Sequence, residues 1–371
     1  MRLTRSQPEA ERLILFYLSK KIIKVGSVVS GGNALDARVC IGMNNISASS
    51  LKGKLAELGE LALIDVRAEG AFAESHLLFA VSIPLDRLEL SFADLVPRQN
   101  TPVVLCDDGS GRAEMAAGRL TRFGYTSIEI LDDGIAGWDE AGYELFSGVN
   151  VPSKAFGEFV EHEYGTPHLP AEELKGKIEA GEDIVVLDSR PLQEFLRMSI
   201  PGAICCPGAE LVYRVPEIVA HPETLVVVNC AGRTRSIIGS QSLINAGIPN
   251  RVVALKNGTM GWHLAGYALE HGKSRIAPEV SAQGVEQSKA FVERVKNRFS
   301  VPSIDMAQLQ RFREQSLERS LFLLDVRSED EFEAGHLPDS KSAPGGQLVQ
   351  ATDEYVGVRN ARLVLIDDTE V

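Results

Sequence analysis

Leu225-Val-Val-Val-Asn-Cys-Ala-Gly-Arg-Thr-Arg-Ser236 is the stretch of this chain that decides its fold. Its apolar start predicts a short buried strand that runs directly into Cys230, and residues 236–246 predict a helix that Gly247 ends. Similar short apolar runs lie at 184–187 and 252–255. Short strands that alternate with helices are typical of a parallel sheet covered on both faces. The stretch therefore predicts the α/β class.

The same order of elements occurs three times along the chain. The motif Leu-Asp-Ser-Arg at 187–190 reappears as Leu63-Ile-Asp-Val-Arg67 and as Leu324-Asp-Val-Arg327. Repetition of a whole α/β unit indicates an internal repeat rather than one large core. We expect three tandem units, each a small parallel sheet with helices on both faces.

Spacing from the motif predicts where a reactive cysteine lies in each repeat. Asp188 precedes Cys230 by 42 residues, Asp65 precedes Cys106 by 41, and each of these cysteines precedes a tryptophan by 32. In the third repeat a cysteine is expected at 367, but the residue is Asp367. We therefore expect two repeats that carry a reactive thiol and a third without one.

These repeats and the composition between them predict the domain organisation. The third repeat ends soon after its strand at 363–366, which favours either a fragment of a longer protein or completion by a partner, such as a second copy in a homo-oligomer. The expected parts are an unassigned extension at 1–43, a first domain at 44–148, a second at 155–272, a linker helix at 273–299 and a truncated third domain at 300–371.

Composition excludes several classes of function. The chain has 51 acidic and 38 basic residues, a net charge of −13, which argues against general binding to nucleic acid or to anionic membranes. The apolar run at 13–18 is too short to span a bilayer. Five cysteines form neither a CxxC pair nor a zinc-like cluster, so we expect reduced cysteines, a cytoplasmic protein and no metal site.

The loop after the second strand predicts an anion site with a nucleophile. A cysteine at the carboxyl end of a parallel strand faces backbone amides and the positive end of the next helix, a setting that favours the thiolate. The alternative is a buried structural cysteine beside two solvated arginines. We predict Cys230 as catalytic, with substrate-binding residues Ala231, Gly232, Arg233, Thr234, Arg235 and Ser236.

The corresponding loop of the first repeat has a different charge. It carries −1 where the second loop carries +2, which should weaken binding of a dianion and disfavour the thiolate. We predict Cys106 as a second, weaker catalytic residue; an inert cysteine is the alternative. Its predicted substrate-binding residues are Asp107, Asp108, Gly109, Ser110, Gly111 and Arg112.

From about residue 44 onward the chain resembles the tandem rhodanese-like sulfurtransferases. The resemblance depends on an ordered set: Asp188-Ser-Arg190 with Glu194-Phe195, then the Cys230 loop, then Met260-Gly-Trp262. It implies that Cys230 takes sulfur from a small anion such as thiosulfate and passes it to a thiol or cyanide. It also implies that two arginines bind the donor's oxygens, and that no metal or organic cofactor takes part.

Other interpretations remain open at this stage. Cys106 and Arg112 have the Cys-x5-Arg spacing of dual-specificity phosphatases and arsenate reductases, and the whole array could instead serve binding or redox sensing. Cys206, next to Cys205, is either a buried core residue or a thiol that resolves the persulfide as a disulfide. We expect His76, His336 and the Asp–Arg pairs of the three motifs to be structural.

Overall fold

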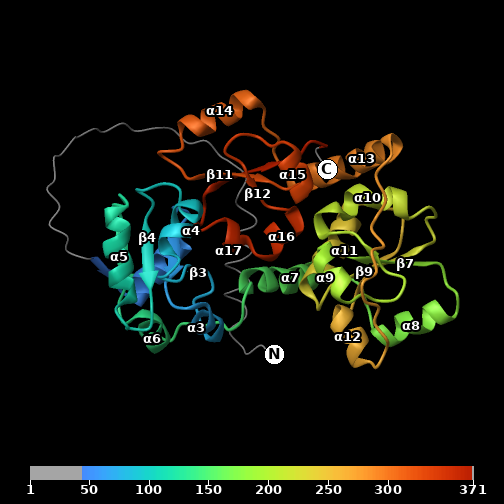
Figure 1. Ribbon diagram of the computed structural model, residues 1–371, viewed down its shortest axis with the longest axis horizontal. Helices are drawn as coiled ribbons and strands as arrows, with labels where there is room; N and C mark the ends of the chain where they lie inside the picture. Colours follow the sequence, from blue (N-terminus) through green and yellow to red (C-terminus); the bar gives the residue numbers. More distant parts are fainter. Residues whose placement is uncertain (1–43, 370–371) are drawn as a thin grey trace. The chain divides into compact units, whose positions relative to one another are not determined.

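The computed structural model describes residues 44–369 (Figure 1). The predicted N-terminal extension, including Cys40, lies outside these residues. The described chain divides into two compact units, and residues of the third repeat belong to both. The first unit contains residues up to 151 with 304–322 and 353–363; the second contains 152–303, 323–352 and the residues from 364 onward.

The first repeat is a five-stranded parallel sheet with the order β1-β5-β4-β2-β3. Its strands are short and apolar, and β2 and β4 are buried along their whole length. The strands are β1 (Asn44–Ile46), β2 (Ala62–Asp65), β3 (Val81–Ser82), β4 (Val103–Cys106) and β5 (Ile128–Leu131), and the helices are α2 (Ala48–Ala56), α3 (Glu69–Glu74), α4 (Leu88–Leu95), α5 (Arg112–Arg122) and α6 (Gly134–Glu140).

The second repeat has the same topology, with the order β6-β10-β9-β7-β8 and all pairs parallel. Its strands are β6 (His168–Leu169), β7 (Ile184–Asp188), β8 (Ile204–Cys205), β9 (Leu225–Asn229) and β10 (Val252–Leu255). Its helices are α7 (Val151–Tyr164), α8 (Ala171–Glu179), α9 (Leu192–Arg197), the 3-10 turn η1 (Gly208–Glu210), α10 (Leu211–Ile218), α11 (Thr234–Ala246), α12 (Gly258–Leu264) and α13 (Ala282–Phe299).

Both faces of the second sheet are covered, as the sequence predicts (Figure 1). On one face Val227 packs with residues of α8, α9 and α12, including Phe195 and Trp262. On the other face Val226 and Val228 pack with α10, α11 and α13. Alternate residues of β9 therefore enter opposite cores, which is why an uninterrupted apolar run was needed in the sequence.

The predicted linker at 273–299 contains the helix α13, which begins at Ala282 and ends at Phe299. Ser281 caps its first turn by accepting a hydrogen bond from the Gly284 amide at 3.1 Å. Phe291 and Val295 pack on the core beneath α10 and α11, so the helix is part of the second repeat's outer layer.

The third repeat contains a sheet of three strands with the order β12-β11-β13. The strands that correspond to β13 in the complete repeats are β4 and β9, and each of these has a neighbouring strand on both sides. Leu363 and Leu365 on β13 are 37% and 60% exposed, consistent with an incomplete unit. The strands are β11 (Leu321–Asp325), β12 (Lys341–Ser342) and β13 (Arg362–Ile366), and the helices are α14 (Met306–Glu314), α15 (Glu329–Ala334), α16 (Gly345–Gln350) and α17 (Thr352–Tyr355).

Candidate functional site

Cys230 lies directly after β9, at the carboxyl end of the sheet. It is 2% exposed, and its thiol donates to Ser236 Oγ at 3.6 Å. Its carbonyl accepts a hydrogen bond from the Thr259 amide at 2.8 Å. A Cβ added to Gly258, which has φ +55°, would lie 2.2 Å from that carbonyl oxygen, so only glycine allows the first turn of α12 to support the loop this closely.

The backbone amides after Cys230 are the donors from which the sequence predicts an anion cradle. Within residues 44–369, the amides of 231–236 have no hydrogen-bond acceptor in the structure, whereas the next amide, that of Ile237, already bonds to the Arg233 carbonyl at 3.1 Å. They surround the start of α11, where the helix dipole is positive. Unpaired amide donors at a helix start, in the residues that directly follow a cysteine, can bind an anion or stabilise a charged sulfur.

Arg235 points from the first turn of α11 to a glutamate of α9. Its two terminal nitrogens donate to the Glu194 carboxylate at 2.7 and 2.9 Å. Burial disfavours the charged form, but Glu194, together with Cys230 and Asp188, raises the pKa of Arg235. A bidentate pair of this kind fixes the guanidinium, so Arg235 is held in place beside the cysteine.

Arg233 is paired with two acidic residues of α7. Its guanidinium donates to both Glu158 oxygens, at 2.7 and 3.0 Å, and to Glu161. The loop residues alone carry +2, but Glu158 and Glu161 come from another element and pair with one of the two arginines. The partners lie 72 to 75 residues away along the chain, so no local pattern marks them.

The first repeat does not place Cys106 where the second places Cys230. Strand register pairs Asp65 with Cys106, but it pairs Asp188 with Asn229, one residue before Cys230. The predicted equivalence of the two cysteines is therefore wrong by one residue, and Asp107 holds the position of Cys230.

Two further contacts agree with this alignment. The Asp107 carbonyl accepts from the Ile135 amide at 2.9 Å, as the Cys230 carbonyl accepts from Thr259. A Cβ on Gly134 would lie 2.1 Å from the Asp107 oxygen, which matches Gly258 below Cys230. The cysteine-to-tryptophan spacing is the same in both repeats only because two differences cancel. Cys106 lies one residue earlier than the position of Cys230, and the first repeat has one residue fewer after its α5 helix.

In the first loop a carboxylate already fills the anion cradle. Asp107 is 4% exposed, and its oxygens accept from the Gly109 amide at 2.8 Å and from the Ala113 amide at 3.1 Å. Ser110 Oγ donates to it at 3.5 Å, and Arg112 turns outward to Ser110 and Asp108. Gly109 and Ser110, which the sequence predicts to bind substrate, thus donate to Asp107 of the same loop.

Cys106 lies within the core of the first repeat. It is fully buried among residues that include Trp138, and its thiol donates to the Ile64 carbonyl at 3.6 Å. Burial, with smaller contributions from Asp65 and Asp107, raises the pKa of Cys106 well above its usual value, against the opposing effect of Arg67. This direction agrees with the expected disfavoured thiolate, but burial, and not the charge of the loop, is the largest cause.

The third repeat repeats the substitution of the first. The Val326 amide bonds to the Ile366 carbonyl at 3.0 Å, as the Ser189 amide bonds to the Asn229 carbonyl at 2.8 Å. Asp367 therefore follows the strand as Cys230 does. Its carboxylate accepts from the Asp368 amide at 2.9 Å and from Thr369 at 3.0 Å.

Cys205 and Cys206 face opposite cores of the second repeat. Cys205 is packed on the side of Phe195 and Cys206 on the side of Leu211. Burial raises the pKa of Cys205 to about 12 and raises that of Cys206 further. These positions favour the buried-core interpretation over a resolving thiol.

We expect alkylation to distinguish these cysteines. At pH 8 iodoacetamide should label Cys230, whereas Cys106, Cys205 and Cys206 should stay unlabelled until the protein is unfolded, because a raised pKa leaves little thiolate at that pH. Peptide-resolved mass spectrometry follows each site separately, including Cys40. Labelling of Cys106 at the rate of Cys230 in the folded protein would contradict the assignment.

The structural pairs behave as predicted from the sequence. The Asp of each motif pairs with its Arg at 2.6 to 2.7 Å, in all three repeats. His76 and His336 each contact a backbone carbonyl through Nδ1, at 2.8 and 3.0 Å, and each stacks on a phenylalanine.

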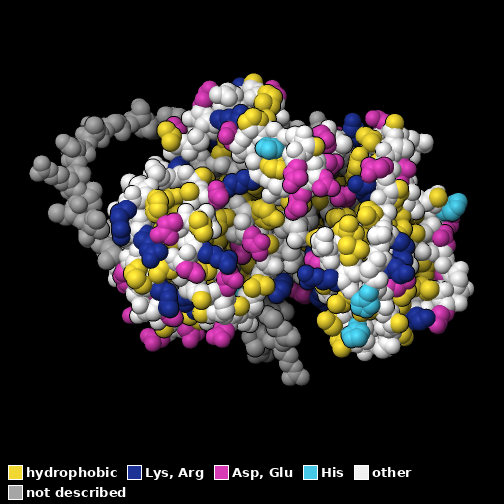
Figure 2. Space-filling model, in the orientation of Figure 1, with side chains coloured by type: hydrophobic (Ala, Val, Ile, Leu, Met, Phe, Trp, Pro, Cys, Tyr) yellow, Lys and Arg dark blue, Asp and Glu magenta, His cyan; other side chains and the backbone are white. Residues whose placement is uncertain are grey.

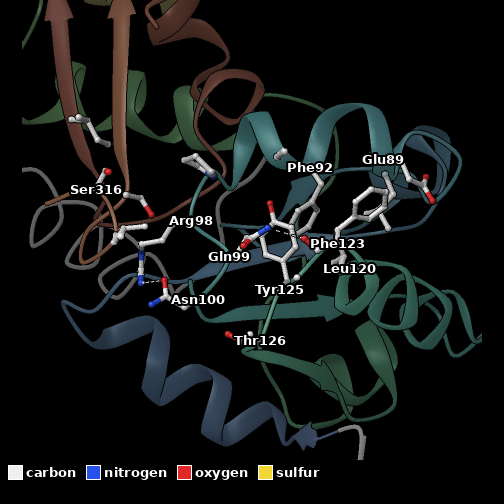
Figure 3. A pocket seen from close by; sticks show the side chains of 17 residues that line it. Glu89, Phe92, Arg98, Gln99, Asn100, Leu120, Phe123, Tyr125, Thr126 and Ser316 are labelled. Carbon is white, nitrogen blue, oxygen red and sulfur yellow. Dashed lines mark hydrogen bonds between the residues drawn. The ribbon is translucent and has the colours of Figure 1, made fainter. Parts of the chain in front are cut away.

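A cavity of about 780 Å³ in the first compact unit lies away from the cysteine loop (Figure 3). It is lined by residues that precede β4, such as Gln99, and by residues that follow α5, such as Phe123 and Tyr125. Because Cys106 is at the other end of β4, this cavity is no part of the predicted site.

The described residues show no large basic surface on the face drawn, no membrane-spanning helix and no cluster of metal ligands. On the face drawn in Figure 2, Lys and Arg side chains lie among Asp and Glu side chains rather than in one basic field. Within residues 44–369 no helix has the length and apolar character needed to cross a bilayer. The same residues contain no group of three or more His, Cys, Asp or Glu side chains that could hold a metal ion.

Comparison with known proteins identifies the family. Residues 47–141 and 170–265, just over half of the chain, match the model of the rhodanese-like domain. The chain therefore belongs to the rhodanese-like domain family.

Individual relatives agree with this assignment. A crystal structure of a thiosulfate sulfurtransferase from Pseudomonas aeruginosa is 51% identical, with a TM-score of 0.87, over 89% of this chain and 62% of that one. This chain thus spans less than two thirds of the length of that protein. A sulfurtransferase from Allochromatium vinosum is 26% identical over 28% of this chain and 94% of its own length. An HTH-type transcriptional regulator from Mycobacterium tuberculosis is 33% identical over 27% of this chain and 43% of the regulator.

Proposed function

We propose that the chain is a rhodanese-type sulfurtransferase that moves sulfane sulfur through a persulfide on Cys230. The observation that carries the proposal is the contrast between the two complete loops. In the first, the Asp107 carboxylate takes the amides of Gly109 and Ala113. In the second, the corresponding amides of Gly232 and Ser236 are free beside a cysteine. The second loop therefore has both a nucleophile and room for its charged product.

The proposed reaction has two steps. The Cys230 thiolate attacks the outer sulfur of thiosulfate, a new S–S bond forms, and the S–S bond of the donor breaks with its electron pair leaving on sulfite. The persulfide anion is then stabilised by the amides of residues 231–236. An acceptor such as cyanide attacks the outer sulfur, leaves as thiocyanate and regenerates the thiolate. No other oxidant or reductant is required, and no metal or organic cofactor is invoked.

The other loop residues support this chemistry in different ways. Arg235 is held beside Cys230 by its bidentate pair with Glu194 and orients its guanidinium there, although the glutamate offsets its charge. Ser236 Oγ accepts from the resting thiol and donates to the Arg233 carbonyl at 2.8 Å. Gly232 and Ala231 leave the loop without bulky side chains in front of the amides.

The alternatives find less support. A phosphatase or arsenate reductase at Cys106 needs an open oxyanion cradle, and the Asp107 carboxylate occupies the amides there. Protection of Cys106 from alkylation by orthovanadate or arsenate would favour that reading. A non-catalytic array remains the alternative, in which the repeats bind partners and the cysteines are vestigial or sense redox changes; Asp367 in place of a cysteine favours a binding role for the third repeat. The expectation from the sequence that Cys106 is a second, weaker sulfur carrier is not part of this proposal, because its thiol lies in the core of the first repeat.

Mass spectrometry tests the proposal directly. The reduced protein is treated briefly with thiosulfate, and the cysteine peptides are then analysed. We expect one added sulfur atom on the Cys230 peptide, removed again by cyanide, and none on the Cys106 peptide. Absence of added sulfur on every peptide would overturn the sulfurtransferase proposal.

Three further predictions accompany this function. The domain limits 44–148, 155–272 and 300–371 are proposed as given by the sequence. A cytoplasmic location is proposed, since the proposed chemistry needs reduced cysteines. The proposed partners are a small sulfur-containing anion and a thiol acceptor; completion of the third repeat by a second copy or by further chain remains a prediction.

A further inference from the structure

Helix α7 is fixed against the helix that follows the Cys230 loop. A Cβ added to Gly157 would lie 2.9 Å from Thr234 Cγ2, so glycine lets α7 approach the first turn of α11. Val160 packs with Ile237 and Ala254 in a small buried cluster. The position of α7 next to the loop is therefore determined by packing and not only by charge.

The packed face of α7 brings two carboxylates to the loop. Glu158 and Glu161 are one turn apart, and both contact the Arg233 guanidinium. The Glu161 side chain is 18% exposed, and its other oxygen lies 3.6 Å from His168 Nδ1. Arg233, which a donor's oxygens would otherwise approach, is thus bound by two acids of its own protein.

These contacts reverse the sign of the local charge. Arg233 and Arg235 contribute two positive charges, and their partners Glu158, Glu161 and Glu194 contribute three negative charges. These five side chains together therefore carry −1 rather than +2. A negative group on the Cys230 loop and the helix packed against it repels an approaching dianion about twice as strongly as a monoanion, because Coulomb energy is proportional to the charge of the ligand.

We infer that Glu158 and Glu161 determine donor specificity and select sulfane-sulfur donors of low charge, such as thiosulfonate monoanions and organic persulfides, over dianions such as thiosulfate. The inference rests on the proposed sulfur transfer at Cys230 and names the substrate class of that site. The two glutamates act through Arg233: they hold its guanidinium and neutralise the charge that a dianion would use.

The test compares two donors in the full-length chain. In the double variant Glu158→Gln and Glu161→Gln, the KM for thiosulfate should fall about tenfold and that for benzenethiosulfonate about threefold, because the shift in free energy follows donor charge. The kcat values should change by less than about twofold, since Cys230 and its amides are untouched. Glutamine keeps the shape of the side chain and its hydrogen-bonding oxygen.

Glu163→Gln is the matched control. It removes one acid from an exposed position on the same helix, away from Arg233, and should leave both KM values unchanged. Equal shifts for the two donors, or no shift, in the double variant would overturn the inference. So would a shift of the same size in the control.

Failure of this inference can be distinguished from failure of the proposed function. If the unaltered protein transfers sulfur through Cys230 but the double variant keeps both KM values, only the role of the glutamates is wrong. If the unaltered protein gains no sulfur on Cys230 from either donor, the proposed function itself fails and the inference with it.

Discussion

Replacing Cys230 with Ser should lower sulfur transfer from thiosulfate to cyanide by about three orders of magnitude or more. A hydroxyl in place of the thiol cannot accept the sulfur atom, although Ser fits the same volume beside Ser236. The measurement is thiocyanate formation under steady-state conditions. Because the carbonyl and amide of residue 230 are unchanged, the loop should keep its contacts with Thr259 and Gly258, and thermal unfolding should be close to that of the unaltered protein.

Cys106→Ser and Cys206→Ser serve as comparisons. Both cysteines are buried in cores away from the loop amides, so each variant should retain most of the activity. Turnover by Cys230→Ser at the level of the unaltered protein would contradict the assignment of the nucleophile. Loss of turnover in Cys106→Ser without loss of folding would restore the first repeat as a second catalytic site.

Arg190→Ala should destabilise the second repeat by about 3–5 kcal/mol. Asp188 is fully buried and accepts from Arg190 Nε at 2.8 Å and from a terminal nitrogen of Arg190 at 2.7 Å. The same nitrogen donates to the Met198 carbonyl at 2.8 Å. Removing the guanidinium leaves a buried carboxylate with only Asn229 and a backbone amide as partners, and leaves that carbonyl without this donor. Urea unfolding measures the loss.

Arg197→Ala provides the control for this effect. Arg197 is an exposed arginine of the neighbouring α9 helix, and its removal should cost no more than about 0.5 kcal/mol. An equal loss of unfolding free energy in the two variants would show that the buried Asp188–Arg190 pair contributes no more to stability than an exposed arginine does. Asn229 also donates to Asp188, at 2.7 Å, and to Thr259, so it links the pair to the turn beneath Cys230.

Local signals in the sequence predicted the strands and helices of the second repeat well. The runs at 184–187, 225–228 and 252–255 are the strands β7, β9 and β10 to within one residue, because each is a buried apolar run between turn signals. The helix expected at 236–246 is α11, which begins two residues earlier. The short edge strands β1 and β6 were not predicted, since two or three residues carry no periodicity.

The site could be predicted only in part. The position of Cys106 depends on strand register, and the pairing of Arg233 depends on contacts between segments far apart in the sequence. A count of residues places Cys106 near the loop, but a one-residue difference moves a side chain to the opposite face of a strand. The spacing of 41 rather than 42 residues was the available signal. Contacts such as Arg233 with Glu158 join segments far apart in sequence, and they become visible only when α7 is placed on α11.

The carboxylate of Asp107 has a consequence for how such arrays evolve. A buried carboxylate presents negative charge to the same amides that would hold a charged sulfur, so the loop is satisfied electrostatically whether or not chemistry occurs there. Loss of catalysis in one copy then need not cost the copy its fold. Copies with aspartate at this position, as at Asp107 and Asp367, are free to diverge while the copy with Cys230 keeps the proposed reaction.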